Sequence, residues 1–511
     1  MWTLEHCHLS DLYSVGSVDN CQCCRLRGYG LTAGAAGTVG ILGEPVREAV
    51  TRYLCVLSAG LLMLQAPDHA LAAGEYTWQR SFGGPTLSDN ALVAATAVDT
   101  SGNVVIVGDM QGSVNFGGTT LTSVGDYDVL VARYSSAGAH LWSRRFGSTG
   151  SDRGFGVGVD SSGNVYVTGN FAGTVNFGGS ALVSAGNADI FLAKYSSAGA
   201  HIWSKRIGGT GADVGNAISV KSDGTFAITG YFGVFGGPVD FGGGPLTSAG
   251  GSDVFVAEYA SSGAHVWSRA IGGIGNDVGF SVAIDGTSGA VAITGYFTGN
   301  VPFACNGITS AGDADGFVLQ YSPTGSLAWI RRFGGTSDDR GTAIAIAPGG
   351  SVVLTGYFNN TADFGGGSHT SVGGVDIFLA KYTRSGTWTW DKVFGTISGF
   401  GDLPKAVAVD FSGNIALTGS IIGGLDFGGG PLCPLCSTYD VFVAKFTSAG
   451  SHVWSHRYVG GNAYDDHGNA VRMDASGNVI VGGYFLDSVD FGGGNMTSPG
   501  GVSGFLAKFA P

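Results

Sequence analysis

Seven tryptophans recur along this chain at intervals of 61 to 64 residues. The segments between them repeat as well. The unit that begins at Trp203 runs WSKRIGG, NAISV, TFAITGYF, VDFGGGPLTSAGGSD, VFVAEY and SSGAHVW, which ends at the next tryptophan. Self-similarity at one long period is the signature of a repeat architecture. The tryptophans that define the period are Trp78, Trp142, Trp203, Trp267, Trp329, Trp390 and Trp454.

Each unit carries four short β-strand patterns. The first contains the tryptophan, the second ends in Val-Asp or a close variant, the third resembles VYVTG at 165–169, and the fourth resembles DIFLAKY at 189–195. The fourth pattern is apolar at both alternating positions, as expected for a strand buried on two sides. Turn sequences rich in Ser, Gly and Asn separate the strands. We therefore expect an all-β protein with four strands in each unit.

The order of the strands at the two ends predicts how the units assemble. A tryptophan strand at 77–82 precedes every other strand, and the chain finishes with a fourth strand, GFLAKFAP at 504–511. The N-terminal strand can thus complete the last unit and leave no open sheet edge. A solenoid would have shorter rungs and capping repeats. We predict a single seven-bladed β-propeller over residues 73–511, with four-stranded blades and a ring closed by the N-terminal strand.

The repeated segments resemble a known family. GGTG-x-D-x-G, VD-x-SGN-x-YVTGYF, VDFGGG and DVFVAKY are similar to the SBBP-type bacterial β-propeller repeat, and the resemblance covers about residues 75–511. The family is associated with exported or cell-surface proteins. The resemblance implies a fold and supplies no catalytic residues.

Composition narrows the class of partner. The net charge is −13, and −11 remains after residue 72. An acidic surface disfavours binding to nucleic acid and to anionic membranes. The 92 glycines lie at fixed turn positions beside apolar strands, which is typical of a turn-rich β protein and not of a disordered one. We expect a monomer without a nucleic-acid partner.

A secretory signal lies ahead of the repeats. Arg47 and Arg52 precede an apolar run at 53–66, and Ala70-Leu71-Ala72 forms a small-x-small cleavage site. This order is that of a signal peptide, and the run is shorter than the roughly 20 residues of a spanning helix. We interpret residues 46–72 as the signal peptide and residues 1–45 as an upstream segment, either translated from a misassigned start or disordered. The mature chain is expected outside the cell, on its surface or in the periplasm, without a transmembrane segment.

Two cysteines form a C-x-x-C pair in a loop of the sixth unit. In an exported β protein, Cys433 and Cys436 favour a local disulfide. Zinc binding, redox chemistry and free thiols are the alternatives; a closed zinc site needs four ligands, and no second pair is visible.

An aspartate recurs once per unit after the tryptophan strand. One interpretation is a ring of carboxylates that binds structural Ca²⁺, which needs six to eight oxygens. The other is that each carboxylate accepts hydrogen bonds from its own loop. Repetition in every unit favours the second interpretation, and we expect no cofactor. The residues are Asp89, Asp152, Asp213, Asp277, Asp338, Asp402 and Asp465.

Departures from the repeat are the best candidates for a binding site. If the Val-Asp strand is innermost, the loop after the tryptophan strand and the long loop that resembles 239–251 share one face. The departures lie at 232–238, 302–305, 404–405, 433–436 and 464–467. They nominate Asp465, Asp466, His467, Phe235 and Asn306 as binding residues, and Asp466 with His467 is their single acid–base pair.

Two functions compete. The first is a non-enzymatic exported scaffold that binds an envelope protein or a glycan. The second is an exported hydrolase or lyase that acts on polysaccharide. The chain contains no G-x-S-x-G, H-E-x-x-H or G-K-[ST] motif, so sequence motifs indicate no catalytic residues.

The signal peptide makes a testable prediction. Cleavage after Ala72 should leave Ala73 as the first residue of the exported protein, because the small-x-small site ends there. N-terminal sequencing of the exported fraction checks this. A chain that begins at Met1 in that fraction would contradict it.

Overall fold

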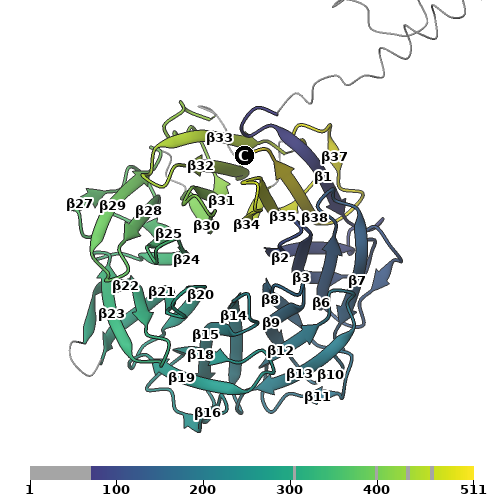
Figure 1. Ribbon diagram of the computed structural model, residues 1–511, viewed down its shortest axis with the longest axis horizontal. Coiled ribbons are helices and arrows are strands. Elements are labelled where there is room, and N and C mark those ends of the chain that lie inside the picture. Colours follow the sequence, from purple (N-terminus) through teal and green to yellow (C-terminus); the bar gives the residue numbers. More distant parts are fainter. Residues whose placement is uncertain (1–70, 303–306, 398–400, 433–437, 461–464) are drawn as a thin grey trace, which may run out of the picture. The chain divides into compact units, whose positions relative to one another are not determined.

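The computed structural model describes residues 71–302, 307–397, 401–432, 438–460 and 465–511. Within them, seven four-stranded antiparallel sheets stand around a central channel like the blades of a propeller (Figure 1). Each blade has the same strand order from the channel outwards: the Val-Asp strand, the VYVTG-like strand, the DIFLAKY-like strand and the tryptophan strand. The predicted fold, blade number and strand order are confirmed.

The strands of the blades follow the repeat. From the innermost strand outwards, they are β2 (Asn90–Val98), β3 (Val104–Gln111), β6 (Asp128–Tyr134) and β7 (His140–Phe146) in blade 1; β8 (Arg153–Val159), β9 (Val165–Phe171), β12 (Asp189–Tyr195) and β13 (His201–Ile207) in blade 2; β14 (Ala212–Val220), β15 (Phe226–Val234), β18 (Asp253–Tyr259) and β19 (His265–Ile271) in blade 3; β20 (Val278–Ile284), β21 (Val291–Val301), β22 (Ile308–Tyr321) and β23 (Leu327–Phe333) in blade 4; β24 (Arg340–Ile346), β25 (Val352–Phe358), β28 (Asp376–Tyr382) and β29 (Trp388–Phe394) in blade 5; β30 (Leu403–Val409), β31 (Ile415–Ile421), β32 (Asp440–Phe446) and β33 (His452–Tyr458) in blade 6; and β34 (His467–Met473), β35 (Val479–Phe485), β38 (Ser503–Phe509) and β1 (Tyr76–Phe82) in blade 7.

The N-terminal strand closes the ring as predicted. β1 pairs antiparallel with β38, with Trp78 opposite Lys508 and Phe82 opposite Gly504. Two backbone hydrogen bonds extend the pairing beyond the strand, from Ala510 to Glu75 and from Gly74 to Ala510. The first strand of the repeat region and the last strand of the chain thus belong to the same blade. Their pairing leaves no open sheet edge between the two ends of the repeat region.

Tryptophans join each blade to the next. The indole N–H of Trp78 in blade 7 donates to the Ser136 carbonyl of blade 1 at 3.0 Å, and Trp142 donates to Ser197 in the next blade at the same distance. The glycine two residues further along each of these turns has a positive φ. A Cβ on Gly138 would lie 2.8 Å from the Trp78 ring. Only glycine fits both the turn and the ring.

The third strand adds a charged link between blades. Arg133 is buried on β6 and forms an ion pair with Asp99, which sits in the first turn of its own blade. The same guanidinium donates to the carbonyls of Gly163 and Ser197 in the following blade. Lys508 occupies this position in blade 7, where it pairs with Asp474 at 2.8 Å and reaches the Ser136 carbonyl of blade 1. These cations therefore cross both ordinary blade junctions and the ring closure.

Short hairpins cover the outer edges of the blades. Their strands are β4 (Ser113–Val114) and β5 (Leu121–Thr122), β10 (Thr174–Val175) and β11 (Leu182–Val183), β16 (Val239–Asp240) and β17 (Pro245–Leu246), β26 (Thr361–Asp363) and β27 (Ser368–Thr370), and β36 (Ser488–Val489) and β37 (Met496–Thr497). Figure 1 shows several of them at the periphery of the ring.

Buried phenylalanines hold these hairpins against the blades. Phe177 is buried at the tip of one hairpin and stacks on Phe191 with ring centroids 4.4 Å apart. The hydroxyl of Tyr195 donates to the Phe177 carbonyl at 2.9 Å. The middle of each such long connection therefore lies against its own blade. The DFGG segments thus carry a core side chain.

The contact between tryptophan and glycine makes a stability prediction. Gly199→Ala should destabilise the protein by about 1–2 kcal/mol for its φ of +77° and by roughly 1–3 kcal/mol more for overlap with Trp142. Gly349→Ala is the control, since Gly349 has a φ of +85° and no atom within 4 Å of the new Cβ. Chemical denaturation measures both variants. Equal losses of stability would show that the ring contact contributes nothing.

Candidate functional site

Two kinds of connection emerge at one end of the blades, which we call the loop face. One leads from an outermost strand to the next innermost strand, and the other leads from a second to a third strand. Asp152 joins the two kinds, because its carboxylate accepts hydrogen bonds from the Ser148 amide at 2.6 Å and from the Ala172 amide at 2.8 Å. The opposite end of the blades carries tight turns, and we call it the turn face.

The recurring aspartate is a structural element of each blade junction. Asp213 repeats the arrangement of Asp152, since its two oxygens accept from the Gly209 and Gly233 amides at 2.7 and 2.9 Å. These oxygens already have donors and do not form a calcium cage. No cluster of three or more His, Cys, Asp or Glu side chains able to hold a metal occurs in the described residues. The side chains at this position are all buried: Asp89, Asp152, Asp213, Asp277, Asp339, Asp402 and Asp466.

For two of the seven recurring aspartates, the residue predicted from the sequence was one position too early. Blades 5 and 7 begin with Asp-Asp pairs, and the second aspartate of each pair, Asp339 or Asp466, is the buried one. Asp339 accepts from the Gly335 and Asn359 amides, whereas Asp338 lies at the surface and contacts Arg340. The buried carboxylate must lie at the start of the innermost strand to reach both loops, and this register selects the second aspartate.

The electrostatics of this position differ between blades. Burial raises the pKa of Asp402 and of Asp466 to about 7. In contrast, hydrogen bonds from Ser113 and Thr86 hold the pKa of Asp89 below its usual value. Asp376 adds to the shift of Asp402. Blade 7 has Ser503 where blade 5 has Asp376, so Asp89 lacks the corresponding carboxylate neighbour.

His467 lies in a polar and aromatic cluster between blades 6 and 7. Its Nδ1 is 2.6 Å from the Ser420 hydroxyl, and its ring packs between Tyr439 and Tyr484 at centroid distances of 6.1 and 4.9 Å. Burial lowers the pKa of His467 to about 4, and the positive charge of Lys405 adds to the shift. The imidazole is therefore neutral at physiological pH.

The other nominated residues have separate positions. Asp465 is exposed, and its carboxylate accepts from the Tyr439 amide at 3.1 Å. Asp466 turns into the blade junction and accepts from the Leu486 amide. Phe235 follows β15 with a φ of +54° and is 98% exposed. Asn306, Cys433 and Cys436 lie outside the described residues.

Two further clusters occupy the position of His467 in other blades. In blade 2, the Arg153 guanidinium lies 4.5 Å from the centre of the Tyr127 ring and 3.7 Å from Asp109. In blade 5, Arg340 lies 4.2 Å from the centre of the Tyr296 ring. Sequence reasoning missed both, although each basic residue directly follows the buried aspartate. The sequence signal that could have found them is a variable residue directly after the recurring aspartate.

The architecture defines the protein as a seven-bladed β-propeller. Comparison with known families identifies its repeat. The SBBP β-propeller repeat model matches residues 141–170, which confirms the resemblance seen in the sequence.

Two curated proteins and one solved structure illustrate the wider similarity. An uncharacterized WD repeat-containing protein of Acanthamoeba polyphaga mimivirus is 24% identical over 69% of this chain and 31% of its own length. The regulatory protein FlaEY of Caulobacter vibrioides is 26% identical over 62% of this chain and 36% of its own. This chain thus spans about a third of the length of these curated relatives. The WD40 β-propeller domain of Doa1 aligns over 86% of this chain and 97% of its own at 10% identity, with a TM-score of 0.43.

No helix long and apolar enough to cross a membrane is found in the part of the chain that the structure describes.

The opposite pKa shifts of Asp466 and Asp89 make a pH prediction. A raised pKa means that ionisation opposes folding, so wild type should lose stability from this group as pH rises from about 4 to 7, by roughly 1 kcal/mol per pH unit. Asp466→Asn should therefore flatten the dependence of unfolding free energy on pH and be at least as stable as wild type at pH 8. Denaturation curves from about pH 2 to 8 measure this for Asp466→Asn and equally for Asp89→Asn.

The matched variant is Asp89→Asn at the same position of blade 1. The lowered pKa of Asp89 means that its ionised form stabilises the fold above pH 4 and that this stabilisation disappears as the group is protonated. Asp89→Asn should therefore lose stability at pH 7 and differ least from wild type at low pH. If both variants respond to pH in the same way, the assigned difference between the two junctions is wrong.

Proposed function

We propose that this protein is an exported, non-enzymatic scaffold that binds an envelope protein or a glycan through its loop face. The observation that carries the proposal is the contrast at each blade junction between a constant buried aspartate and a variable residue directly after it. The constant residue fixes the loops, and the residue after it varies between blades: Asn90, Arg153, Val214, Val278, Arg340, Leu403 and His467. A binding surface on a rigid scaffold needs residues that keep the loops in place and neighbouring residues that can vary to contact a partner.

The chemistry around the loop face suits recognition. Arg153 and Arg340 pack on tyrosines, and His467 lies between two more. Tyrosine and arginine are enriched in binding interfaces because they combine apolar area with hydrogen bonding. Arg153 and Arg340 are already held against their tyrosines in the free protein, which lowers the conformational entropy lost on binding.

The placement of Asp466 and His467 supports a scaffold over a hydrolase or lyase. General acid–base catalysis needs both groups within hydrogen-bond reach of the reacting atoms. Asp466 is buried against the Leu486 amide, and His467 is engaged with Ser420. With a pKa near 4, His467 is also poorly matched to proton transfer at neutral pH.

Export rests on the sequence of residues 46–72, where a basic, an apolar and a small-residue region follow in order. An exported chain encounters envelope proteins and glycans first, which is why we propose these classes of partner.

Two exposed phenylalanines provide a matched test of the face. Phe235 belongs to the loop face and is 98% exposed, and Phe411 belongs to a tight turn on the turn face and is 84% exposed. We expect binding of the full chain to a glycan array, or to purified envelope proteins on a sensor surface, to weaken at least about threefold in Phe235→Ala combined with Arg340→Ala. Phe411→Ala should bind as wild type does.

Loss of binding in Phe411→Ala with retention in the loop-face variant would assign the partner to the turn face. Turnover of any polysaccharide that binds the array, measured as release of reducing ends or unsaturated products, would replace the scaffold proposal with the enzymatic alternative.

A further inference from the structure

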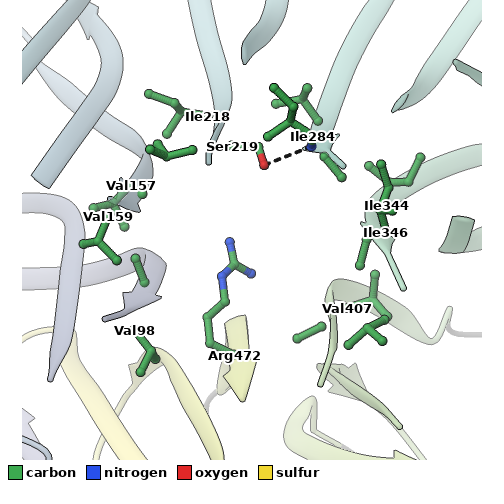
Figure 2. Close-up of a pocket in the computed structure, with 18 of the residues that line it drawn as sticks. Val98, Val157, Val159, Ile218, Ser219, Ile284, Ile344, Ile346, Val407 and Arg472 are labelled. Atoms are coloured by element: carbon green, nitrogen blue, oxygen red, sulfur yellow. Dashed lines mark hydrogen bonds between the residues drawn. The ribbon is translucent and has the colours of Figure 1, made fainter. Parts of the chain in front are cut away.

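The central channel is lined by aliphatic side chains together with polar groups. The innermost strands contribute valines, isoleucines and alanines, among them Val157, Ile218, Val282 and Ile344. The cavity is about 280 Å³ towards the turn face and about 170 Å³ towards the loop face. Among the polar side chains, Ser219 accepts a hydrogen bond from the Ile284 amide at 3.1 Å (Figure 2). The part towards the loop face is also lined by Thr96, Asn216, Ser281, Thr342 and Asn469. The channel can therefore hold a small organic molecule.

A strong charge enters this channel. Figure 2 shows the guanidinium of Arg472, on β34, extending into the channel. The other six innermost strands carry a small residue at the same position, which precedes the strand's last residue: Ala97, Gly158, Ser219, Ala283, Ala345 and Ala408. The fold therefore does not need an arginine at this position, and packing does not explain why Arg472 replaces a small residue.

Arg472 has no carboxylate partner among the described residues. One of its nitrogens donates to the Val471 carbonyl at 2.9 Å. The carboxylate nearest along the strand, Asp474, is engaged by Lys508 at 2.8 Å and by the amides of Ser476 and Asn478. A guanidinium has five N–H donors, so most of those of Arg472 remain available. Burial lowers the pKa of Arg472, which reflects the cost of removing this charge from water.

A second cation lines the same channel closer to the loop face. Lys405 lies on β30, at the position of Ala94 in blade 1 and of Asn469 in blade 7. It forms no ion pair within the described part of the chain. Its side chain is exposed at the channel, and desolvation by the surrounding strands lowers its pKa. Lys405 and Arg472 both line the 170 Å³ part of the cavity. Two unpaired cations thus face an otherwise uncharged lining.

We propose that the channel binds a small carboxylic acid whose carboxylate is held by Arg472 and Lys405. A planar guanidinium donates two parallel hydrogen bonds to a carboxylate, and an ammonium adds a third donor. The valine and isoleucine side chains would cover the hydrocarbon part of the molecule. This site lies inside the ring, so the inference does not depend on the loop-face partner proposed above.

Glutarate is a suitable probe, with neutral glutaramide as its matched control and inorganic phosphate as a different anion. Titration calorimetry and thermal shift with the full chain should show binding of glutarate and little of glutaramide or phosphate. Arg472→Ala should weaken glutarate binding at least about tenfold, since charge-assisted hydrogen bonds are lost. Arg472→Lys should bind more weakly than wild type, and Lys405→Ala should also lose affinity.

Folding and binding are separable in this experiment. Arg472→Ala should melt at or above the temperature of wild type, because alanine occupies the position in four blades. Arg331→Ala removes an exposed charge from the outermost strand β23 and should leave binding unchanged. The proposal is overturned if glutarate does not bind wild type, if phosphate binds and glutarate does not, or if Arg472→Ala binds glutarate as wild type does.

Discussion

The contact between a tryptophan and the next blade's glycine turn is the interaction on which the ring depends. The indole lies on the glycine and, at several junctions, donates its N–H to a carbonyl of the same turn. Strands within a blade are held by ladders of backbone hydrogen bonds. Blades meet through side chains and through single backbone hydrogen bonds, such as that from the Asp152 amide to the Tyr127 carbonyl, and the tryptophan contact links them at the outer edge. At the closure, Gly74 lies against Trp454 in the same way. The ring therefore uses one joint throughout.

A second contact between blades lies at the loop face, where some residues are constant between blades and others vary. The buried aspartates bind backbone amides of two loops at once. Because the loops are held from within, the neighbouring positions are free to vary, as Arg153, Arg340 and His467 do. The same division occurs in the channel, where six small residues face one arginine. In both places, candidate function lies in the member that departs from the repeat.

The comparison of sequence and structure shows where repeat reasoning succeeds and where it is limited. The Asp-Asp pairs at 338–339 and 465–466 could not be resolved from spacing, because either member keeps the period within its normal variation. The strand order predicted that the long loops leave the blades at one face. It did not predict that burial of Phe177 and its equivalents folds the middle of these loops onto the blade edges, because such packing depends on the neighbouring strand.

The sequence by itself determined the seven blades, the four strands in each, their order and the closure by the N-terminal strand. These follow from local periodicity and from counting strands, which need no knowledge of distant contacts. Only the tertiary structure decided which aspartate of a pair is buried, which side chains surround His467, and that Arg472 and Lys405 share one channel. Arg472 and Lys405 are 67 positions apart in the sequence, and ring closure of the innermost strands is what brings their charges into the same space.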